Sequence, residues 1–130
     1  MLDLDGALRA YAAMMNTSNL EELEPHLADD FQYASQWVFA EISSKQDFVN
    51  YIKPKLDTVK ASGATVWAEM GHLDREFPGP CVVLAQGEKD NLIAIVLAQV
   101  DNGKIVRLDM CGAPSPRSAQ RSGRYPGRPQ

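Results

Sequence analysis

The sequence predicts an α+β domain in which about three helices pack on one face of a curved antiparallel sheet. Three observations lead to this prediction. Apolar residues recur with a helical period before Gly63, four runs rich in β-branched residues follow it, and short turn-like separators join those runs. Runs joined so tightly form an antiparallel meander, and the preceding helices then cover one of its faces.

The first 27 residues predict two helices. An apolar face recurs at helical spacing and consists of Leu4, Leu8, Tyr11, Ala12 and Met15. Residues 16–19 (NTSN) interrupt this pattern, and Asn19 is a good N-cap for a second helix over residues 20–27. Pro25 lacks an amide hydrogen, so we expect it to tighten or kink that short helix.

Residues 29–39 (DDFQYASQWVF) predict the first strand, because their side chains alternate in character with a period of two. One face of the strand carries Phe31, Tyr33, Ser35 and Trp37. Ser43 or Ser44 then caps a third helix, which should end at Gly63 and bend at Pro54. The apolar side of this helix consists of Phe48, Ile52 and Leu56.

The four later runs predict the meander. They read TVWAEMGHL, CVVLAQG, NLIAIVLAQV and KIVRLDMCG, and their separators are DREFPGP, EKD and DNG. In the last run, the face expected to point inward consists of Val106, Leu108, Met110 and Gly112. The face expected to point outward consists of Ile105, Arg107, Asp109 and Cys111. A β-bulge would reverse this assignment.

Charge divides the chain into a predicted domain, residues 1–113, and a basic tail, residues 114–130. The domain has a net charge of −8 and the tail has four arginines and no acidic residue, so a nucleic-acid partner is not expected. The tail is rich in Pro, Ser, Gly and Arg and should not order itself by burial. A solvated segment is the ordinary interpretation of such a tail; the alternatives are that it lies across the acidic body of its own or a neighbouring subunit, or docks through Tyr125.

Several classes of protein are not expected. No run approaches the 18 apolar residues that a membrane span needs, and Asp3 and Asp5 stand where a signal peptide would be positive. We therefore expect a cytoplasmic protein without a membrane partner. Cys81 and Cys111 lie in apolar runs without a CxxC pattern, so we expect reduced, packed thiols, with a disulfide as the alternative, and no metal or cofactor.

The element order and the stretch AYAAMMNTSNLEELEPHLADDFQYAS, followed later by DNGKIVRL at the last strand, resemble the nuclear transport factor 2-like superfamily over roughly residues 4–112. That group includes ketosteroid isomerases, polyketide cyclases and epoxide hydrolases, and also non-enzymatic dimerisation and transport modules. The resemblance implies a cystatin-like cone, in which a bent sheet wraps the helices and leaves an apolar cavity open at one end.

Ketosteroid isomerases of this superfamily use a helix-1 tyrosine, a carboxylate base on the first strand and a second oxyanion donor on a later strand. By this resemblance Tyr11 matches the tyrosine, Ser35 stands at the position of the base and Val96 near that of the second donor. A serine without a partner is not a base near neutral pH, so the resemblance argues against a steroid isomerase. Tyr11 and Asp109 remain the catalytic candidates, with Asp109 the weaker.

A small-molecule pocket in the cone would be lined by Met15, Tyr33, Ser35, Trp37, Leu56, Leu108 and Met110. For each of these positions ordinary core packing is the alternative, as it is for Tyr11. Arg107 and Asp109 fit a dimer interface at least as well, because the outer sheet face often has that role in this superfamily. His26 and His72 suit solvated loops, and the direction of Glu69 is left open.

Two functions are therefore compatible with the sequence. The first is binding of a small apolar or aromatic molecule in the cone, with or without an isomerase-, cyclase- or hydrolase-type activity. The second is a non-catalytic homodimeric interaction module that uses the tail. A homodimer is expected in both, because one layer of helices cannot cover such outer-face residues as Val82, Leu84, Ile93 and Ile95.

Overall fold

The computed structural model describes residues 1–36, 40–75 and 78–128. The helices are α1 (Leu4–Thr17) and α2 (Lys45–Ser62), and the short 3-10 turns are η1 (Leu20–Glu22), η2 (Glu24–His26) and η3 (Pro116–Ser118). The strands are β1 (Leu27–Ser35), β2 (Ala40–Ile42), β3 (Val66–Leu73), β4 (Gly79–Gln86), β5 (Leu92–Asp101), β6 (Lys104–Cys111) and β7 (Gln120–Arg121). Among the described residues, no helix is long and apolar enough to cross a membrane.

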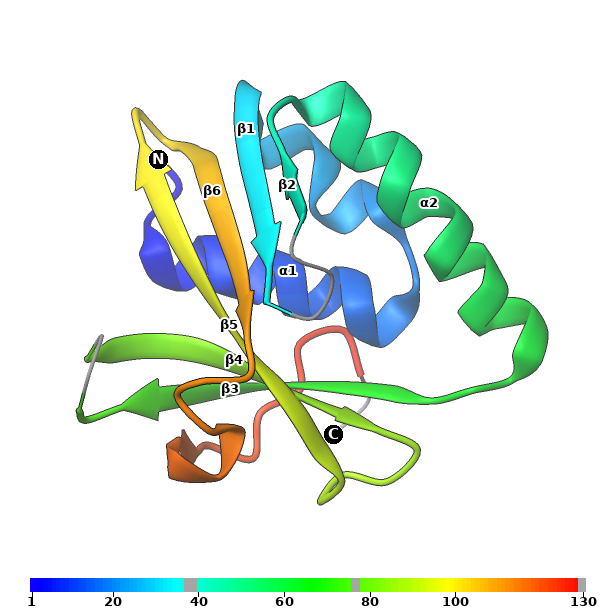
Figure 1. Ribbon diagram of the computed structural model, residues 1–130, viewed down its shortest axis with the longest axis vertical. Helices are drawn as coiled ribbons and strands as arrows, with labels where there is room; N and C mark the ends of the chain where they lie inside the picture. Colours follow the sequence, from blue (N-terminus) through cyan, green and yellow to red (C-terminus); the bar gives the residue numbers. More distant parts are fainter. Residues whose placement is uncertain (37–39, 76–77, 129–130) are drawn as a thin grey trace.

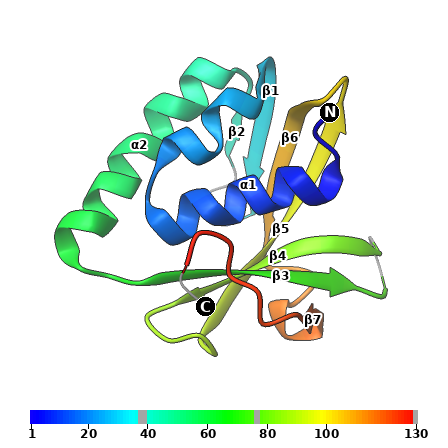
Figure 2. The same cartoon turned by 180° about the vertical axis from the view of Figure 1, so that it is seen from behind.

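All the strands belong to one sheet with the order β2-β1-β6-β5-β4-β3-β7. The four strands of the predicted meander pair with each other antiparallel, as expected, and β6 then pairs with β1 in parallel. Figure 1 shows that β3 and β4 run across the direction of β1 and β6, so the sheet is strongly bent. Both helices lie on the same side of it, as the view from behind shows (Figure 2). The predicted α+β architecture is confirmed.

The two long helices begin and end where their sequences supply caps. The Asp3 carboxylate accepts a hydrogen bond from the Gly6 amide (2.8 Å) at the start of α1, and Ser18 ends that helix in the left-handed conformation (φ 55°). The Ser44 hydroxyl caps α2 by accepting from the Asp47 amide at 3.1 Å, and Gly63 ends it at φ 70°. The predicted bounds of both helices are therefore close to those observed.

The predicted second helix is wrong. Asn19 does act as a cap, because its side chain accepts a hydrogen bond from the Glu21 amide, but the residues after it form the 3-10 turns η1 and η2. Pro25 cannot donate the amide hydrogen that an α-helix would need there. Leu27 already begins β1, four residues before the predicted aromatic alternation starts at Phe31.

The main core lies between the helices and the sheet. Its aromatic centre is Phe31 of β1 against Phe48 of α2, with ring centroids 5.0 Å apart in an edge-to-face arrangement. A smaller apolar cluster occupies the other face of the sheet and consists of Leu73, Cys81, Val83 and Ile95. Ala119, from the C-terminal tail, packs against this second cluster.

The predicted outer face of the meander needs correction. Val82 and Leu84 are buried in the main core under the helices, and Ile93 packs partly against it. Ile95 does lie on the other face, but it is fully buried in the cluster that the tail covers. These residues therefore no longer supply an uncovered apolar surface, and the argument for a homodimer that rested on them fails.

The predicted faces of the last strand are correct only beyond a bulge. The pairing of β5 with β6 shifts register between Gln99 and Val100, which pair with Arg107 and Ile105, so Val106 is the extra residue. Ile105 consequently lies in the main core, contrary to expectation, and Leu108 lies there as predicted. Past the bulge the assignment holds, because Arg107 and Asp109 lie on the face opposite Leu108.

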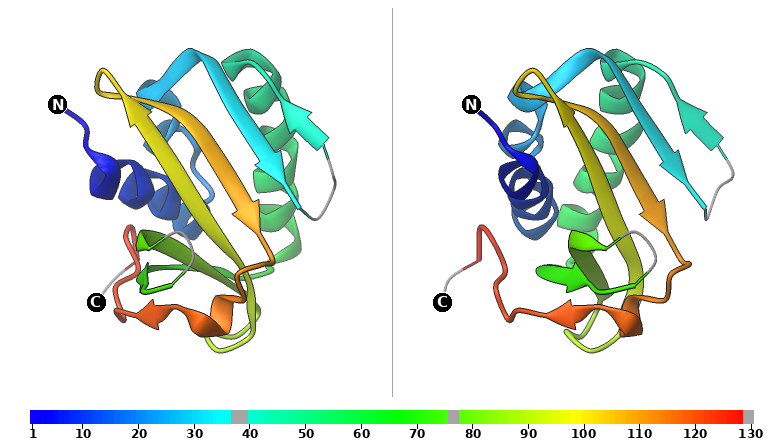
Figure 3. Two further views of the ribbon diagram at one scale, coloured as in Figure 1. Left: turned by 60° about the vertical axis from the view of Figure 1, so that its left-hand side comes forward. Right: turned by 90° about the vertical axis from the view of Figure 1, so that its left-hand side faces the viewer.

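The tail lies across its own chain, which is one of the arrangements expected for it. It does not order itself by burying apolar surface; it is attached to the β3 edge of its own chain by hydrogen bonds and ion pairs, with β7 as its strand. Figure 3 shows the tail leaving β6, passing under the sheet and reaching the far side of β3. Tyr125 docks within the chain, with its ring centroid 5.7 Å from that of Trp67.

Candidate functional site

A cluster of hydroxyl groups lies inside the cone, where α1, β1, α2 and β6 meet. Tyr11 comes from α1, Tyr33 and Ser35 from alternate positions of β1, and Tyr51 from α2. We call these four residues, together with Met110 of β6, the tyrosine cluster. Because Tyr33 pairs with Leu108 and Ser35 with Met110, the pleat of β1 and β6 directs this set toward the core.

Tyr33 is at the centre of the tyrosine cluster. Its ring lies 5.7 Å from the Tyr51 ring, centroid to centroid, and its hydroxyl oxygen is 3.9 Å from the Met110 sulfur. Its hydroxyl also interacts with the side chains of Ser35 and Tyr51. The structure thus brings together Tyr11, Tyr33, Ser35 and Met110, which the sequence placed in one pocket.

The phenols of Tyr11 and Tyr33 are held in their neutral form. Burial raises the pKa of Tyr11 well above 10, and repulsion from charge on Tyr33 or Tyr51 raises it further. Burial is also the main cause that raises the pKa of Tyr33. Neutral phenols donate hydrogen bonds, so the cluster suits a carbonyl or another acceptor oxygen.

The other predicted pocket residues are placed less directly at this cluster. Leu56 is buried in the core, and Met15 is half-buried against it, while its neighbour Met14 is the fully buried methionine. Val96 is buried in the core as well. Trp37 lies outside the residues that the structure describes.

Tyr51 is the member of the cluster that the sequence reasoning missed. It follows Phe48 by three residues on α2, and that spacing, which puts it near the core face of the helix, was the available signal. The Lys55 ammonium lies 4.6 Å from the centre of the Tyr51 ring, one turn further along the exposed side. This cation is held over the ring face by the ring quadrupole.

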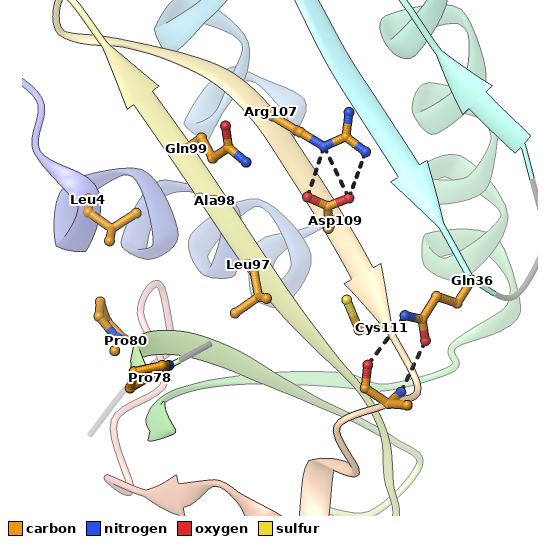
Figure 4. Close-up of a pocket in the computed structure, with 12 residues that line it drawn as sticks. Leu4, Gln36, Pro78, Pro80, Leu97, Ala98, Gln99, Arg107, Asp109 and Cys111 are labelled. Carbon is orange, nitrogen blue, oxygen red and sulfur yellow. Dashed lines mark hydrogen bonds and ion pairs between the residues drawn. The ribbon is translucent and has the colours of Figure 1, made fainter. Parts of the chain in front are cut away.

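Asp109 does not share a site with Tyr11. It projects from the other face of β6, where its carboxylate receives hydrogen bonds from the Arg107 guanidinium at 3.0 to 3.2 Å (Figure 4). Arg107 also donates to Gln32 at 3.1 Å and pairs with Glu41 at 3.2 Å. Hydrogen bonding to Asp109 is the main cause that raises the pKa of Arg107. The Asp109 carboxylate is therefore already paired with a guanidinium.

The Arg107–Asp109 pair lines a groove of about 450 Å³ on the outer face of the sheet (Figure 4). We call it the outer groove. Its apolar lining includes Leu4, Pro78, Pro80, Leu97 and Ala98. Gln36 closes one end, where its side-chain oxygen accepts hydrogen bonds from the amides of Gly112 and Ala113 at 2.8 and 3.0 Å. The groove is separated from the tyrosine cluster by the sheet itself.

The remaining titratable candidates do not form a reactive site. His72 lies in β3 and not in a loop, but its side chain is more than half exposed, as is that of Asp74, whose carboxylate is 3.4 Å from His72 Nδ1. Cys81 and Cys111 are free and buried, and burial raises the pKa of Cys81 to about 11. Within the described ranges, no three His, Cys, Asp or Glu side chains are grouped to hold a metal.

Comparison with known proteins identifies the fold but no activity. No family model matches the sequence, and no curated protein matches it. A nuclear transport factor 2-like protein of unknown function from Cytophaga hutchinsonii superposes with a TM-score of 0.58 at 14% identity, over 90% of this chain and 96% of that one. A SnoaL-like protein of unknown function from Burkholderia thailandensis gives 0.59 at 14% identity, over 88% of this chain and 90% of that one.

A third similar structure contains a bound small molecule. It is a protein with a ketosteroid isomerase-like fold from Catenulispora acidiphila in complex with trimethylamine, with a TM-score of 0.51 at 13% identity over 84% of this chain and 86% of that one. At these identities the likeness concerns the backbone fold. The bent sheet around α1 and α2, and its match to these three structures, show that this chain has the nuclear transport factor 2-like fold.

Proposed function

We propose that this protein binds a small, largely apolar molecule carrying an acceptor oxygen, with the tyrosine cluster as its polar anchor. The observation that carries the proposal is that phenols from α1, β1 and α2 lie close enough to influence one another's pKa within an otherwise apolar interior. Sites of this kind consist mainly of apolar surface and a few convergent polar groups, which fix the orientation of the ligand.

The chemistry of the cluster favours binding over proton transfer. Tyr11 and Tyr33 are donors in their neutral form and could stabilise negative charge that develops on a ligand oxygen. A general base must lie within hydrogen-bond reach of the proton that it removes. By the resemblance, Ser35 stands at the position of the base, and Asp109 is on the opposite face of the sheet. This arrangement supports a binding protein, or an enzyme whose base is not Asp109.

Tyrosine substitutions in the full chain test the proposal. Thermal-shift screening of small aromatic ketones and phenols should yield compounds that bind the wild type. Because a hydrogen bond contributes about 1 kcal/mol, Tyr33→Phe should weaken their binding roughly fivefold, measured by calorimetry. Tyr125→Phe is the matched control, because this tyrosine lies in the tail against Trp67, and it should leave the affinity unchanged.

Two results would contradict the proposal. One is that no compound in the screen stabilises the wild type. The other is that Tyr33→Phe and Tyr125→Phe alter the affinity equally, which would place the ligand away from the cluster.

For the expected homodimer, we propose the outer groove as the interface. Leu97 and the exposed Leu4 supply apolar surface there. The Arg107–Asp109 pair is neutral as a whole, so burying it against a second copy would cost less than burying single ions. Sedimentation at micromolar concentration should give twice the chain mass, and Leu97→Arg, on the same face as Asp109, should reduce it to a monomer. A monomeric wild type would refute this proposal.

A further inference from the structure

The β3 edge is covered residue by residue, although β7 spans only Gln120 and Arg121. A strand at the edge of a sheet leaves the amide and carbonyl of every second residue unpaired. On β3 these residues are Val66, Ala68, Met70 and His72. The tail, with help from α1, supplies partners to all four, and it runs beside β3 in the view from behind (Figure 2).

The partners differ along the edge. His72 pairs with Gln120 of β7, and Met70 donates to the Arg124 carbonyl at 2.9 Å and accepts from the Ser122 amide at 3.1 Å. Further along, the Asn16 side chain of α1 donates to the Ala68 carbonyl and accepts from the Ala68 amide, both at 2.8 Å.

The last position is closed by Arg128, which donates to the Val66 carbonyl. The tail thus occupies the edge as an irregular strand whose hydrogen bonds are shared between backbone and side chains.

At one point of the β3 edge, the buried carboxylate of Glu69 binds the side chain of Arg121 in a geometry that suits arginine. Glu69 is only 3% exposed, and each of its oxygens has a donor at 2.7 Å, namely Arg121 Nε and the Gly123 amide. Arg121 spreads its remaining donors to the Asp90 carboxylate at 2.8 Å and the Lys89 carbonyl at 2.9 Å. The planar fork of arginine reaches these acceptors together, whereas a lysine ammonium would not.

A second arginine is recognised by an aromatic surface. The Arg128 guanidinium lies 4.0 Å from the centre of the Trp67 ring, and Tyr125 meets the same ring edge-on. Gly127 between them adopts φ +85° and lies against α1, where an added Cβ would come within 2.8 Å of the Thr17 methyl. The spacing of arginines, glycines and tyrosine in the tail therefore matches this surface closely.

The groups that recognise the tail belong to the predicted domain, and the groups that they recognise belong to an exposed segment of the tail. Glu69, Trp67 and the β3 edge lie in residues 1–113, while Arg121, Ser122, Gly123 and Arg124 are all exposed. Few apolar contacts hold the segment; ion pairs and hydrogen bonds do, and these form again readily with an equivalent segment from elsewhere.

We propose that the β3 edge, with Glu69 and Trp67, is a recognition site for an extended arginine-bearing peptide. In this chain the site is filled by its own tail, and it accepts the same tail segment from a second copy. The inference is independent of the tyrosine cluster and goes beyond the small-molecule function. A tethered segment acts at an effective concentration in the millimolar range, so the chain's own tail excludes the second copy unless its hold is weakened.

The test uses the full chain and a fluorescent peptide with the sequence of residues 117–130. In full-length Arg121→Ala the resident tail loses its contact with Glu69, so the site should open to the peptide. Fluorescence anisotropy should show binding to Arg121→Ala at least tenfold tighter than to the wild type. The double variant Arg121→Ala/Glu69→Gln should lose that binding at least tenfold, because glutamine lacks the negative charge and its NH2 group cannot accept the hydrogen bond from the Gly123 amide of the peptide.

Matched peptides separate recognition from charge. A peptide with Arg121→Ala should fail to bind, whereas one with Arg117→Ala should bind normally, because the exposed Arg117 carries the same charge away from Glu69. The proposal is overturned if Arg121→Ala does not bind the peptide, if Glu69→Gln has no effect on binding, or if both peptides are impaired equally.

Circular dichroism establishes that each variant is folded. Should Arg121→Ala not fold, Arg121→Lys serves as the host, because it keeps the positive charge but lacks the fork. The same three results are then expected, and absence of peptide binding to a folded Arg121→Lys would equally refute the proposal.

Discussion

Replacing Asn16 by alanine should destabilise the protein more than any other single truncation on α1 that removes no apolar group. The Asn16 amide makes three short hydrogen bonds to backbone, two with Ala68 of β3 at 2.8 Å and one to the Pro126 carbonyl at 2.7 Å. Ala68 is fully buried, so its amide and carbonyl have limited access to water once Asn16 is gone.

The expected magnitude follows from these contacts. Three hydrogen bonds at about 1 kcal/mol each give a loss of about 3 kcal/mol. Alanine has a better helix propensity than asparagine, which returns about 0.5 kcal/mol. The free energy of unfolding should therefore fall by about 2 to 3 kcal/mol, which lowers the urea midpoint by roughly 1 M at a slope of about 2 kcal/mol per M.

Asn50→Ala is the matched control for this measurement. Asn50 lies on α2, gains the same helix propensity, and accepts one exposed hydrogen bond from Gln46 at 3.1 Å. Its urea midpoint, followed by circular dichroism, should stay within about 0.3 M of the wild type. If Asn16→Ala unfolds at the same urea concentration as Asn50→Ala, then the hydrogen bonds of Asn16 to β3 and the tail do not contribute to the free energy of unfolding.

Two further predictions concern the tyrosine cluster and the tail. Because the folded state raises the pKa of Tyr11 and Tyr33 above the ordinary value of 10, their contribution to stability should be complete below pH 10 and decline as the pH rises further. Unfolding free energies at pH 8 and pH 11 check this, and Tyr33→Phe should reduce the difference; an unchanged difference would contradict the assignment. Gly127→Ala should release the tail, because the new methyl group would meet Thr17 at 2.8 Å, whereas Gly63→Ala, also at positive φ but with open space around it, should not. Limited proteolysis at Arg121 and Arg124 measures the release, and equal cleavage in both variants would count against the packing described for Gly127.

Local patterns in the sequence were sufficient for the fold class and for most elements. The helical period before Gly63 and the caps at Ser44 and Gly63 predict α2 within a residue or two, and the turn-like separators predict the meander. These features depend on neighbouring residues, so they can be read without the rest of the chain. The second helix failed for the opposite reason, since a short segment with Pro25 gains too little from local bonds to remain helical.

The candidate site was predictable only in part. The alternation of β1 correctly put Tyr33 and Ser35 on the inner face, and the resemblance correctly brought Tyr11 to them. Whether Tyr51 joins the cluster depends on which face of α2 packs against the sheet. The separation of Asp109 from Tyr11 depends on which face of β6 points toward the helices. The alternation of side chains along one strand does not reveal the bulge at Val106, because a bulge depends on how that strand pairs with its neighbour.

The sequence by itself determined the α+β order of elements, their approximate bounds and the aromatic inner face of β1, because periodicity and capping act over a few residues. Only the tertiary structure decided the fate of the tail. In the sequence, its arginines are typical of a solvated basic segment. In the structure, Glu69, some fifty positions earlier, is buried at the sheet edge and its carboxylate pairs with Arg121. A buried carboxylate requires a partner, and no local pattern can show which distant segment supplies it.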